Sequence, residues 1–110
     1  MPIPNAELAV IDIRKLCDYC LNPLHDEGQH KARVFATVLS LTAEDAEDLR
    51  TLLLQAVKTA DAQWGRRDAY GQRSTVDVLL TWRYKQAMGR SGWIIEHDSD
   101  TPRLTTCYPL

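Results

Sequence analysis

The sequence lacks an excess of basic residues and any long apolar run. Lys and Arg number 13 against 15 Asp and Glu, which gives a formal net charge of −2. Broad, non-specific DNA binding usually needs a basic excess, so we do not expect it, although a local basic patch remains compatible with this composition. No apolar stretch approaches the roughly 20 residues that cross a bilayer. The N-terminal MPIPNAELAV also lacks a basic segment followed by an apolar one, which predicts a cytoplasmic protein without a secretory signal or membrane contact.

Cysteine is scarce and cofactor motifs are missing. Cys17 and Cys20 have the CxxC spacing, but the sequence offers no second CxxC and no HxxxH, and Cys107 stands alone. Because structural zinc takes about four ligands, we expect these cysteines to be small buried hydrophobic residues in a reducing compartment. A metal or redox role is the weaker alternative, as is a metal site at His25 or His97. The absence of P-loop, GxGxxG and GxSxG motifs predicts no nucleotide cofactor.

What is present predicts one domain over residues 1–110, with helices in the N-terminal half. Asp12 can cap a first helix that Asn22-Pro23 ends. A second helix is expected from about Gln29 to Leu39. A third has Thr42 as its cap and acidic residues in its first turn, and it should end near Ala60.

The C-terminal half has the alternating pattern of strands. We expect an edge strand over Asp61–Arg67 with Trp64 facing inward, then strands over Gln72–Trp82, Met88–Glu96 and Arg103–Tyr108. The connection between the second and third is placed at Tyr84–Ala87, and the three tryptophans are expected in the core. Short turns between strands predict antiparallel pairing. The fold class is therefore α+β, with N-terminal helices packed on one face of a three- to four-stranded antiparallel sheet.

The segment GQHKARVF, residues 28–35, joins polar residues to an apolar run at a helix start. His30 lies in the first turn, where the helix dipole favours a neutral imidazole that can accept a proton. Lys31 and Arg33 can stabilise an anion beside it. These are groups that RNA cleavage requires, namely a base for the 2′-hydroxyl and cations for the phosphorane-like transition state. The alternative is an ordinary polar first turn in which Arg33 pairs with Asp26 or Glu27.

Polar strand residues form a second candidate cluster. Arg73 and Arg90 would suggest an anionic ligand if the sheet places them side by side, since two adjacent cations without a carboxylate are costly. Asp77 is the carboxylate that could neutralise them. Thr105 on the last strand is a candidate for orienting a phosphate, although threonine is also simply a good strand former.

Five segments resemble, in order, an uncharacterised bacterial domain family. They are LCDYCLNPLHDEGQHKARVF, LTAEDAEDLRTLLLQA, AYGQRSTVDVLLTW, GRSGWII and PRLTTCYPL. The organisation of this family is similar to that of bacterial toxin nucleases of the barnase, EndoU, colicin and RelE type, which place helices before a four-stranded antiparallel sheet. The resemblance implies a site between the first polar helix and the open sheet face, that is, at His30 and Lys31 with Arg90, Thr105 and Arg73. It also implies a small protein partner. The acidic balance departs from the strongly basic RelE-like toxins.

Two hypotheses follow for the function. The leading one is a metal-independent, ribonuclease-like toxin domain acting on RNA, with His30, Lys31 and Thr105 as catalytic residues and Arg33, Arg73 and Arg90 as substrate-binding residues. The alternative is a non-catalytic binding module, such as an antitoxin, an immunity protein or an accessory protein, that binds a cognate small protein. The oligomeric state is left open, and a homodimer formed through edge strands is one option.

Overall fold

The computed structural model describes residues 1–110, and its helices precede a four-stranded antiparallel sheet. A short turn η1 (Ala6–Leu8) leads to α1 (Ile13–Lys15) and the π-helical turn η2 (Leu16–Cys20). The helices α2 (Gln29–Leu39) and α3 (Ala46–Val57) follow, with the 3₁₀ turn η3 (Ala43–Asp45) directly before α3. The strands are β1 (Ala62–Asp68), β2 (Gly71–Trp82), β3 (Lys85–Glu96) and β4 (Arg103–Pro109). The expected α+β class and the antiparallel sheet are confirmed.

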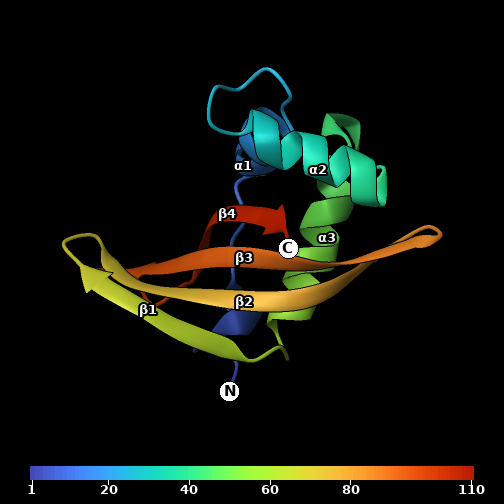
Figure 1. The fold of residues 1–110 in the computed structure, drawn as a ribbon. Helices are drawn as coiled ribbons and strands as arrows, with labels where there is room; N and C mark the ends of the chain where they lie inside the picture. The colour runs from blue at the N-terminus through green and yellow to red at the C-terminus, as the bar shows by residue number, and fades with distance from the viewer.

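The sheet has the simple strand order β1-β2-β3-β4, so every neighbour in space is also a neighbour in sequence. Figure 1 shows α3 behind the sheet, while α1 and α2 lie together beyond the β4 edge. The parallel bridge between Val10 and Arg103 also protects that edge. The β1 edge pairs only with β2 and is left open.

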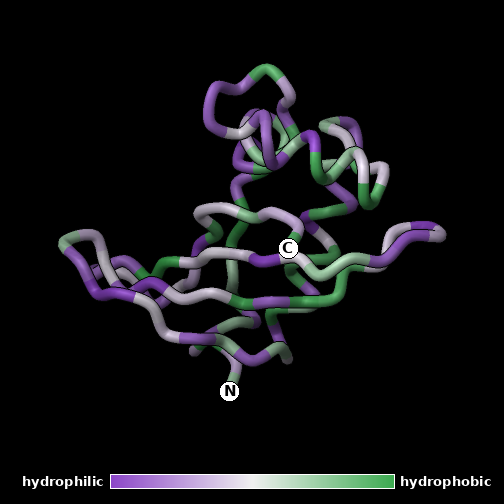
Figure 2. The backbone as a smooth tube through the Cα atoms, viewed as in Figure 1, coloured by the Kyte–Doolittle hydropathy of each residue, from purple (hydrophilic) through white to green (hydrophobic).

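Alternation along β2 decides which sheet face is covered. Ser74, Val76, Val78 and Leu80 are buried, whereas Asp77 and Leu79 between them are exposed. The same alternation is visible in Figure 2, where a hydrophilic position interrupts the hydrophobic run of β2. The core comprises the buried side of β2 together with residues of η2, α2, α3, β3 and β4, among them Leu16, Phe35, Leu49, Leu53, Trp93 and Leu104. The opposite sheet face carries the exposed positions of β2, such as Asp77 and Leu79, and we call it the outer face.

Several boundaries follow the sequence-based expectation and others do not. The second helix spans Gln29–Leu39 as predicted, and Asp12 caps α1 by accepting a hydrogen bond from the Arg14 N–H at 3.0 Å. The third helix ends at Val57, before Ala60, and Thr42 forms its capping box with Asp45. The β2–β3 turn is tighter than expected, because β3 already begins at Lys85.

The predicted inward position of Trp64 is wrong. This side chain is 58% exposed, since no element packs over the open edge strand β1. Trp93 lies in the core as predicted, while Trp82 is half-buried at the end of β2. No helix of the structure has the length and apolar character that crossing a membrane requires.

Candidate functional site

The centre of the candidate site is Lys31, which two tyrosines hold. Its Nζ atom donates a hydrogen bond to the Tyr19 hydroxyl at 2.9 Å. It also lies 5.0 Å from the centroid of the Tyr19 ring and 5.7 Å from that of Tyr108. The hydrogen bond with Tyr19 is the main cause that raises the pKa of Lys31, against the opposing effect of burial. The amine is therefore a half-buried cation.

Lys31 has no carboxylate partner. The ion pairs of the structure engage Arg14, Arg50, Arg66, Arg73, Arg90, Arg103 and the N-terminus. Aromatic faces and a phenol stabilise an ammonium without neutralising it. The positive charge of Lys31 thus remains available to an anion.

The local backbone explains how Tyr19 and Lys31 meet. Gly28 caps α2 and is buried against η2. A Cβ atom at this position would lie 2.1 Å from the carbonyl oxygen of Tyr19. Only glycine allows this approach, which brings the first turn of α2 onto the π-helical turn and places Lys31 over the Tyr19 side chain.

His30 and Lys31 share a shallow hollow of about 430 Å³ with Val34, Tyr108 and Pro109. His30 is exposed, so a substrate can reach its ring. The structure therefore brings an imidazole, an unneutralised ammonium and a phenol to the same opening between α2 and β4. Tyr108 was missed at the level of the sequence, as was Tyr19. Both lie in segments that carry the family resemblance, next to Cys20 and Cys107, and that position is the signal that could have identified them.

Arg90 adjoins this hollow through the sheet register. It is the direct β3 partner of Tyr108 on β4. Its guanidinium forms a bidentate ion pair with Asp77, in which Nε donates to Oδ1 at 2.8 Å and Nη2 donates to Oδ2 at 2.9 Å. This hydrogen-bonded pair lowers the pKa of Asp77 and raises that of Arg90. Asp77 is thus the neutralising carboxylate that the sequence offered, and Arg90 has further N–H donors besides the two that bond Asp77.

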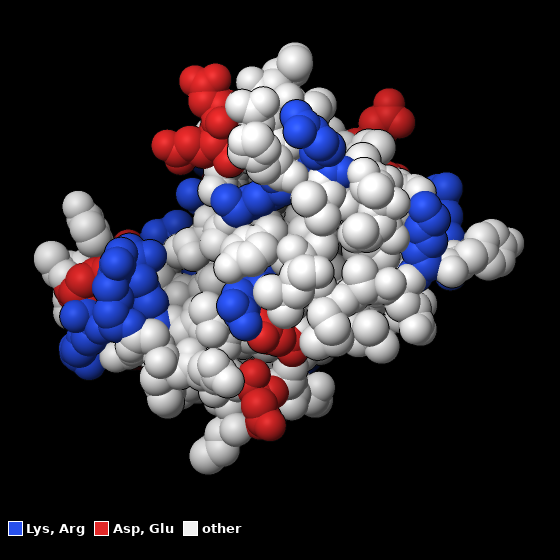
Figure 3. Space-filling view, viewed as in Figure 1, with Lys and Arg blue, Asp and Glu red and all other residues white.

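The structure separates Arg73 from Arg90. Arg73 faces Ile94 across the β2–β3 ladder, whereas Asp77, four residues further along β2, faces Arg90. Arg73 instead donates from Nε to Oδ2 of Asp68 at 2.8 Å, and this bond is the largest of the causes that lower the pKa of Asp68. Figure 3 shows blue Lys and Arg side chains gathered over the β1–β2 end, and a smaller blue and red contact nearer the middle of the sheet.

Thr105 lies in a neighbouring hollow of about 600 Å³, which is lined by Asp12, Arg14, Lys15, Asp18, Tyr19, His25, Glu27 and Thr105. The His25 ring is held in one orientation in this hollow, because its Nδ1 atom accepts hydrogen bonds from the N–H groups of Glu27 and Gly28, both at 3.0 Å. The remaining ring nitrogen, Nε2, therefore carries the proton of the neutral ring. Tyr19 lines this hollow and also contacts Lys31, so it joins the two hollows.

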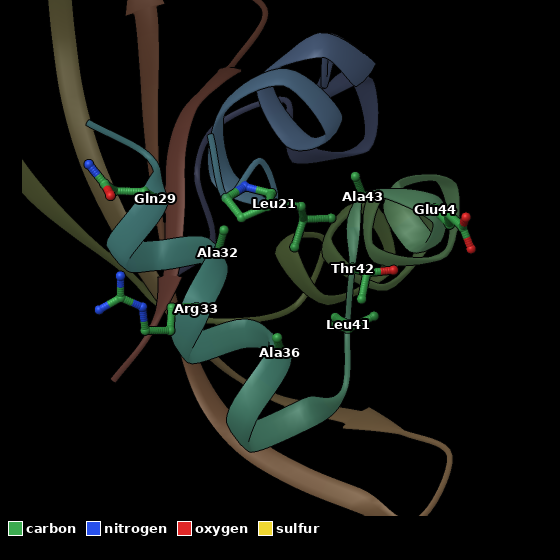
Figure 4. A pocket seen from close by; sticks show the side chains of 10 residues that line it. Leu21, Gln29, Ala32, Arg33, Ala36, Leu41, Thr42, Ala43 and Glu44 are labelled. Carbon is green, nitrogen blue, oxygen red and sulfur yellow. The ribbon is translucent and has the colours of Figure 1, made fainter. Parts of the chain in front are cut away.

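Arg33 is exposed and forms no ion pair, so the pairing with Asp26 or Glu27 that was the alternative to a binding role is not present. It stands on the rim of a third hollow of about 630 Å³ between α2 and η3. Figure 4 shows Ala32 and Ala36 on α2 facing Leu41 and Ala43 across this hollow, with Arg33 and Glu44 on opposite sides.

The cysteines fill space in the core. Cys20 and Cys107 are buried and free, and the N–H of Cys107 donates to the Cys20 sulfur at 3.4 Å. The hydrogen bond to Cys20 and burial together raise the pKa of the Cys107 thiol. No group of three or more His, Cys, Asp or Glu side chains converges in a way that could hold a metal ion.

The sequence matches the model of the family described as Domain of unknown function (DUF6883) over residues 2–110. The chain belongs to this family. The resemblance to an uncharacterised domain family is therefore confirmed, and the match covers the helices, the sheet and every candidate site residue. No curated protein matches the chain in sequence.

A solved structure shares the fold of this DUF6883 domain. It is described as "Contact-dependent growth inhibition toxin - immunity protein complex from Klebsiella pneumoniae 342". A chain of it superposes with a TM-score of 0.72 at 15% sequence identity, covering 93% of the present chain and 100% of the other. At this identity the likeness concerns the fold, and it agrees with the expected arrangement of helices before a four-stranded antiparallel sheet.

Proposed function

We propose that this DUF6883 domain is a metal-independent, ribonuclease-like bacterial toxin domain that acts on RNA in the cytoplasm. The observation that carries the proposal is the unneutralised Lys31 ammonium beside the exposed His30 ring in one open hollow. An RNA phosphodiester supplies the anion that this cation lacks. Support also comes from the fold shared with a chain of a toxin–immunity complex.

The proposed reaction is an internal transfer within RNA. His30 takes the proton of a 2′-hydroxyl, the 2′-oxygen forms a bond to phosphorus, and the bond from phosphorus to the 5′-oxygen breaks. The leaving 5′-oxygen takes a proton from a donor on the other side of the phosphate, for which we assign the Tyr108 hydroxyl. Lys31 and the remaining N–H groups of Arg90 stabilise the additional negative charge on the phosphoryl oxygens. The products are a 2′,3′-cyclic phosphate and a free 5′-hydroxyl.

The other predicted residues take supporting roles in this proposal. Thr105, in the adjoining hollow with Tyr19, contacts the nucleotide next to the scissile phosphate. Arg33 and Arg73 lie outside the His30 hollow, and we assign them to substrate phosphates further along the chain.

The test is RNA cleavage by purified protein in EDTA, with tRNA and unstructured oligonucleotides as substrates. The His30→Ala protein should cut at least about 100-fold more slowly, the usual minimum effect of removing a general base. Lys58→Ala is the matched surface control, because Lys58 is an exposed residue at the end of α3. The ribonuclease proposal fails if wild-type protein leaves every RNA intact while its circular dichroism shows a folded chain.

A second candidate is a non-catalytic binding module with a cognate small protein, such as an antitoxin or immunity protein. It is favoured by apolar side chains on the outer face, where Leu79 is 56% exposed and its β3 partner Met88 is 44% exposed. Leu110 extends this patch, since its N–H donates to the Met88 carbonyl oxygen at 2.8 Å and its side chain is 60% exposed. This function would be selected if the His30→Ala protein kept full biological activity and a Leu79→Ser, Met88→Ser protein lost that activity.

A further inference from the structure

A row of exposed apolar side chains crosses three strands on the outer face. Leu79 on β2 lies opposite Met88 on β3 in the sheet register. The N–H of Leu110 donates to the Met88 carbonyl oxygen at 2.8 Å, which continues the pairing of Gly89 with Pro109 by one residue and places Leu110 opposite Met88. Each of the three side chains is at least 44% exposed. Because opposite residues in a sheet point to the same face, the three form one continuous row.

The row continues from the sheet onto α2. Figure 1 shows the end of β4 between β3 and α2. Pro109, the last residue of β4, lines the His30 hollow together with Val34 of α2. Val34 is 40% exposed, and Val38, one helical turn further, is 37% exposed on the same side of the helix. We call the whole surface the apolar patch, which consists of Val34, Val38, Leu79, Met88 and Leu110.

The chain segments that form the apolar patch lack acidic residues. Although the chain has 15 Asp and Glu residues, none occurs in residues 28–43, 78–95 or 101–110. Asp77 borders the patch, but both of its carboxylate oxygens accept hydrogen bonds from Arg90. Figure 3 shows a broad white area, without red atoms, to the right of the blue and red contact near the middle of the sheet. Since Lys31 has no carboxylate partner, the patch offers positive charge and no free negative charge.

These features define the chemistry of a partner. Aliphatic side chains give nucleic-acid bases no aromatic ring on which to stack, so the apolar patch does not suit RNA. A second copy that docked through the same face would bring together two surfaces without a free carboxylate and leave each Lys31 without a counter-charge. A different protein that presents apolar side chains among Asp and Glu satisfies both the exposed row and the ammonium.

The apolar patch and the His30 hollow overlap. Val34 belongs to both, and Pro109 in the wall of the hollow directly precedes Leu110. A protein seated on the patch therefore covers the opening beside Lys31.

We propose that the apolar patch is the docking surface of a separate protein whose contact face combines large apolar side chains with Asp and Glu, and that this partner closes the His30 hollow. The docking surface stands on the exposed row and on the absence of acidic residues around it. Its consequence, inhibition of RNA cleavage, rests on the proposed ribonuclease function.

The experiment selects partners from a phage-displayed library of small three-helix proteins that are randomised on one face. The library is first depleted on the Leu79→Ser, Met88→Ser protein and then selected on wild-type protein. The selected binders should carry both large apolar residues and Asp or Glu on the randomised face. Binders without this acidic and apolar composition, or no enrichment after the depletion, would overturn the proposal.

Variants outside the depletion step measure what a selected binder recognises. Val38→Ser should raise its Kd about fivefold or more, because apolar side chains buried at an interface supply most of the binding energy. Lys31→Met should raise Kd at least about tenfold, since it leaves a binder carboxylate without its cation. Leu8→Ser, Leu24→Ser is the matched control, because both leucines are more than half exposed and lie outside the patch. This control should change Kd by less than about twofold, and equal losses in the control and in Val38→Ser would contradict recognition of the patch.

Cleavage assays test whether the partner closes the hollow. A selected binder at saturating concentration should abolish RNA cleavage by wild-type protein. The Leu79→Ser, Met88→Ser protein should cleave RNA with the wild-type KM and resist the inhibition. A raised KM in this variant would assign the apolar patch to RNA. A wild-type dimer in size-exclusion chromatography that becomes a monomer in the same variant would assign the patch to a second copy, and either result overturns the proposal.

The outcomes separate the two proposals. If acidic binders recognise the patch but wild-type protein leaves RNA intact, the docking surface stands and the ribonuclease function fails. If wild-type protein cleaves RNA and no acidic binder is selected at the patch, the function stands and the docking surface fails.

Discussion

The Lys31 ammonium donates to the Tyr19 hydroxyl at 2.9 Å while lying over the ring of Tyr108. The two tyrosines come from opposite ends of the chain, one from η2 and one from β4, and α2 brings Lys31 between them. The candidate site is therefore a product of tertiary packing at the β4 edge. Its charge is stabilised by dipoles and aromatic faces, which is how a site retains a cation for an incoming anion.

Replacing Lys31 tests the charge itself. Lys31→Met keeps a long side chain against the two rings, but it removes the ammonium, so RNA cleavage should fall at least about 100-fold while the melting temperature changes little. Lys31→Arg should recover part of the activity because it restores the charge in a different shape. Initial rates on a fluorogenic RNA measure both. Equal activity of Lys31→Met and wild-type protein would contradict a role for this cation.

The hydrogen bond from Lys31 to Tyr19 predicts a pH-dependent contribution to stability. Because this bond raises the pKa of Lys31 in the folded state, its stabilisation is complete below about pH 10.4 and is lost as the pH rises above that value. Tyr19→Phe removes the hydroxyl and keeps the ring. We expect it to lower the free energy of unfolding by about 1 kcal/mol at pH 7, and the difference from wild-type protein should shrink above about pH 10.4. Urea titrations at several pH values provide the measurement, and a difference that grows with pH would contradict this assignment.

Local patterns predicted much of this fold because local chemistry decides it. The α2 boundaries follow from an amphipathic run that begins after Gly28, and the alternation of β2 fixes which residues face the core. Trp64 shows where this reasoning stops. Its alternation points it toward the helix side of the sheet, but burial also needs an element packed above it, and no pattern in β1 reveals that this edge is open.

The site was predictable only in part, for a related reason. His30 and Lys31 are neighbours in sequence and line the same hollow, so the polar sequence at the start of α2 was enough to identify them as candidates. The pairing of Arg90 with Asp77 and of Arg73 with Asp68 depends on strand register and on the β1–β2 turn. Tyr108 and Tyr19 lie too far apart in sequence for any local pattern to place them on the same lysine. The catalytic and binding roles of all these residues stay predictions.

Asp77 offers a second test of electrostatics, with the opposite dependence on pH. Arg90 lowers the pKa of Asp77, so the stabilisation by this pair is present near neutral pH and is lost as the pH falls below about 4. The pair is more than a third exposed, and Asp77→Asn should therefore cost at most about 1 kcal/mol at pH 7. The cost should shrink progressively as the pH falls below about 4, as chemical unfolding can show.

The same substitution should affect substrate binding. With the carboxylate gone, Arg90 carries an unneutralised charge beside Tyr108, so KM for RNA should decrease by a few-fold and become more dependent on salt. The pair of Arg103 with Glu96 is a similar ion pair at the other end of β4, and Glu96→Gln serves as the control. A KM that is unchanged in Asp77→Asn, or lowered equally in Glu96→Gln, would remove Arg90 from the RNA-binding surface.

Gly28 connects the stability of the fold to the geometry of the site. An alanine Cβ would lie 2.1 Å from the Tyr19 carbonyl oxygen, a distance that only movement of the backbone can relieve. Gly28→Ala should therefore destabilise the protein by about 2–3 kcal/mol, which corresponds to a decrease in melting temperature of about 10 °C or more. It should also separate α2 from η2, so that the remaining folded protein loses the bond from Lys31 to Tyr19 and cleaves RNA slowly.

Gly65→Ala is the control, because a Cβ at this exposed position of β1 would meet its nearest atom at an ordinary 3.4 Å. It should change stability by no more than about 0.5 kcal/mol. Calorimetry on the two variants compares them directly, and similar melting temperatures would show that α2 and η2 can part without cost, against the close packing on which the position of Lys31 depends.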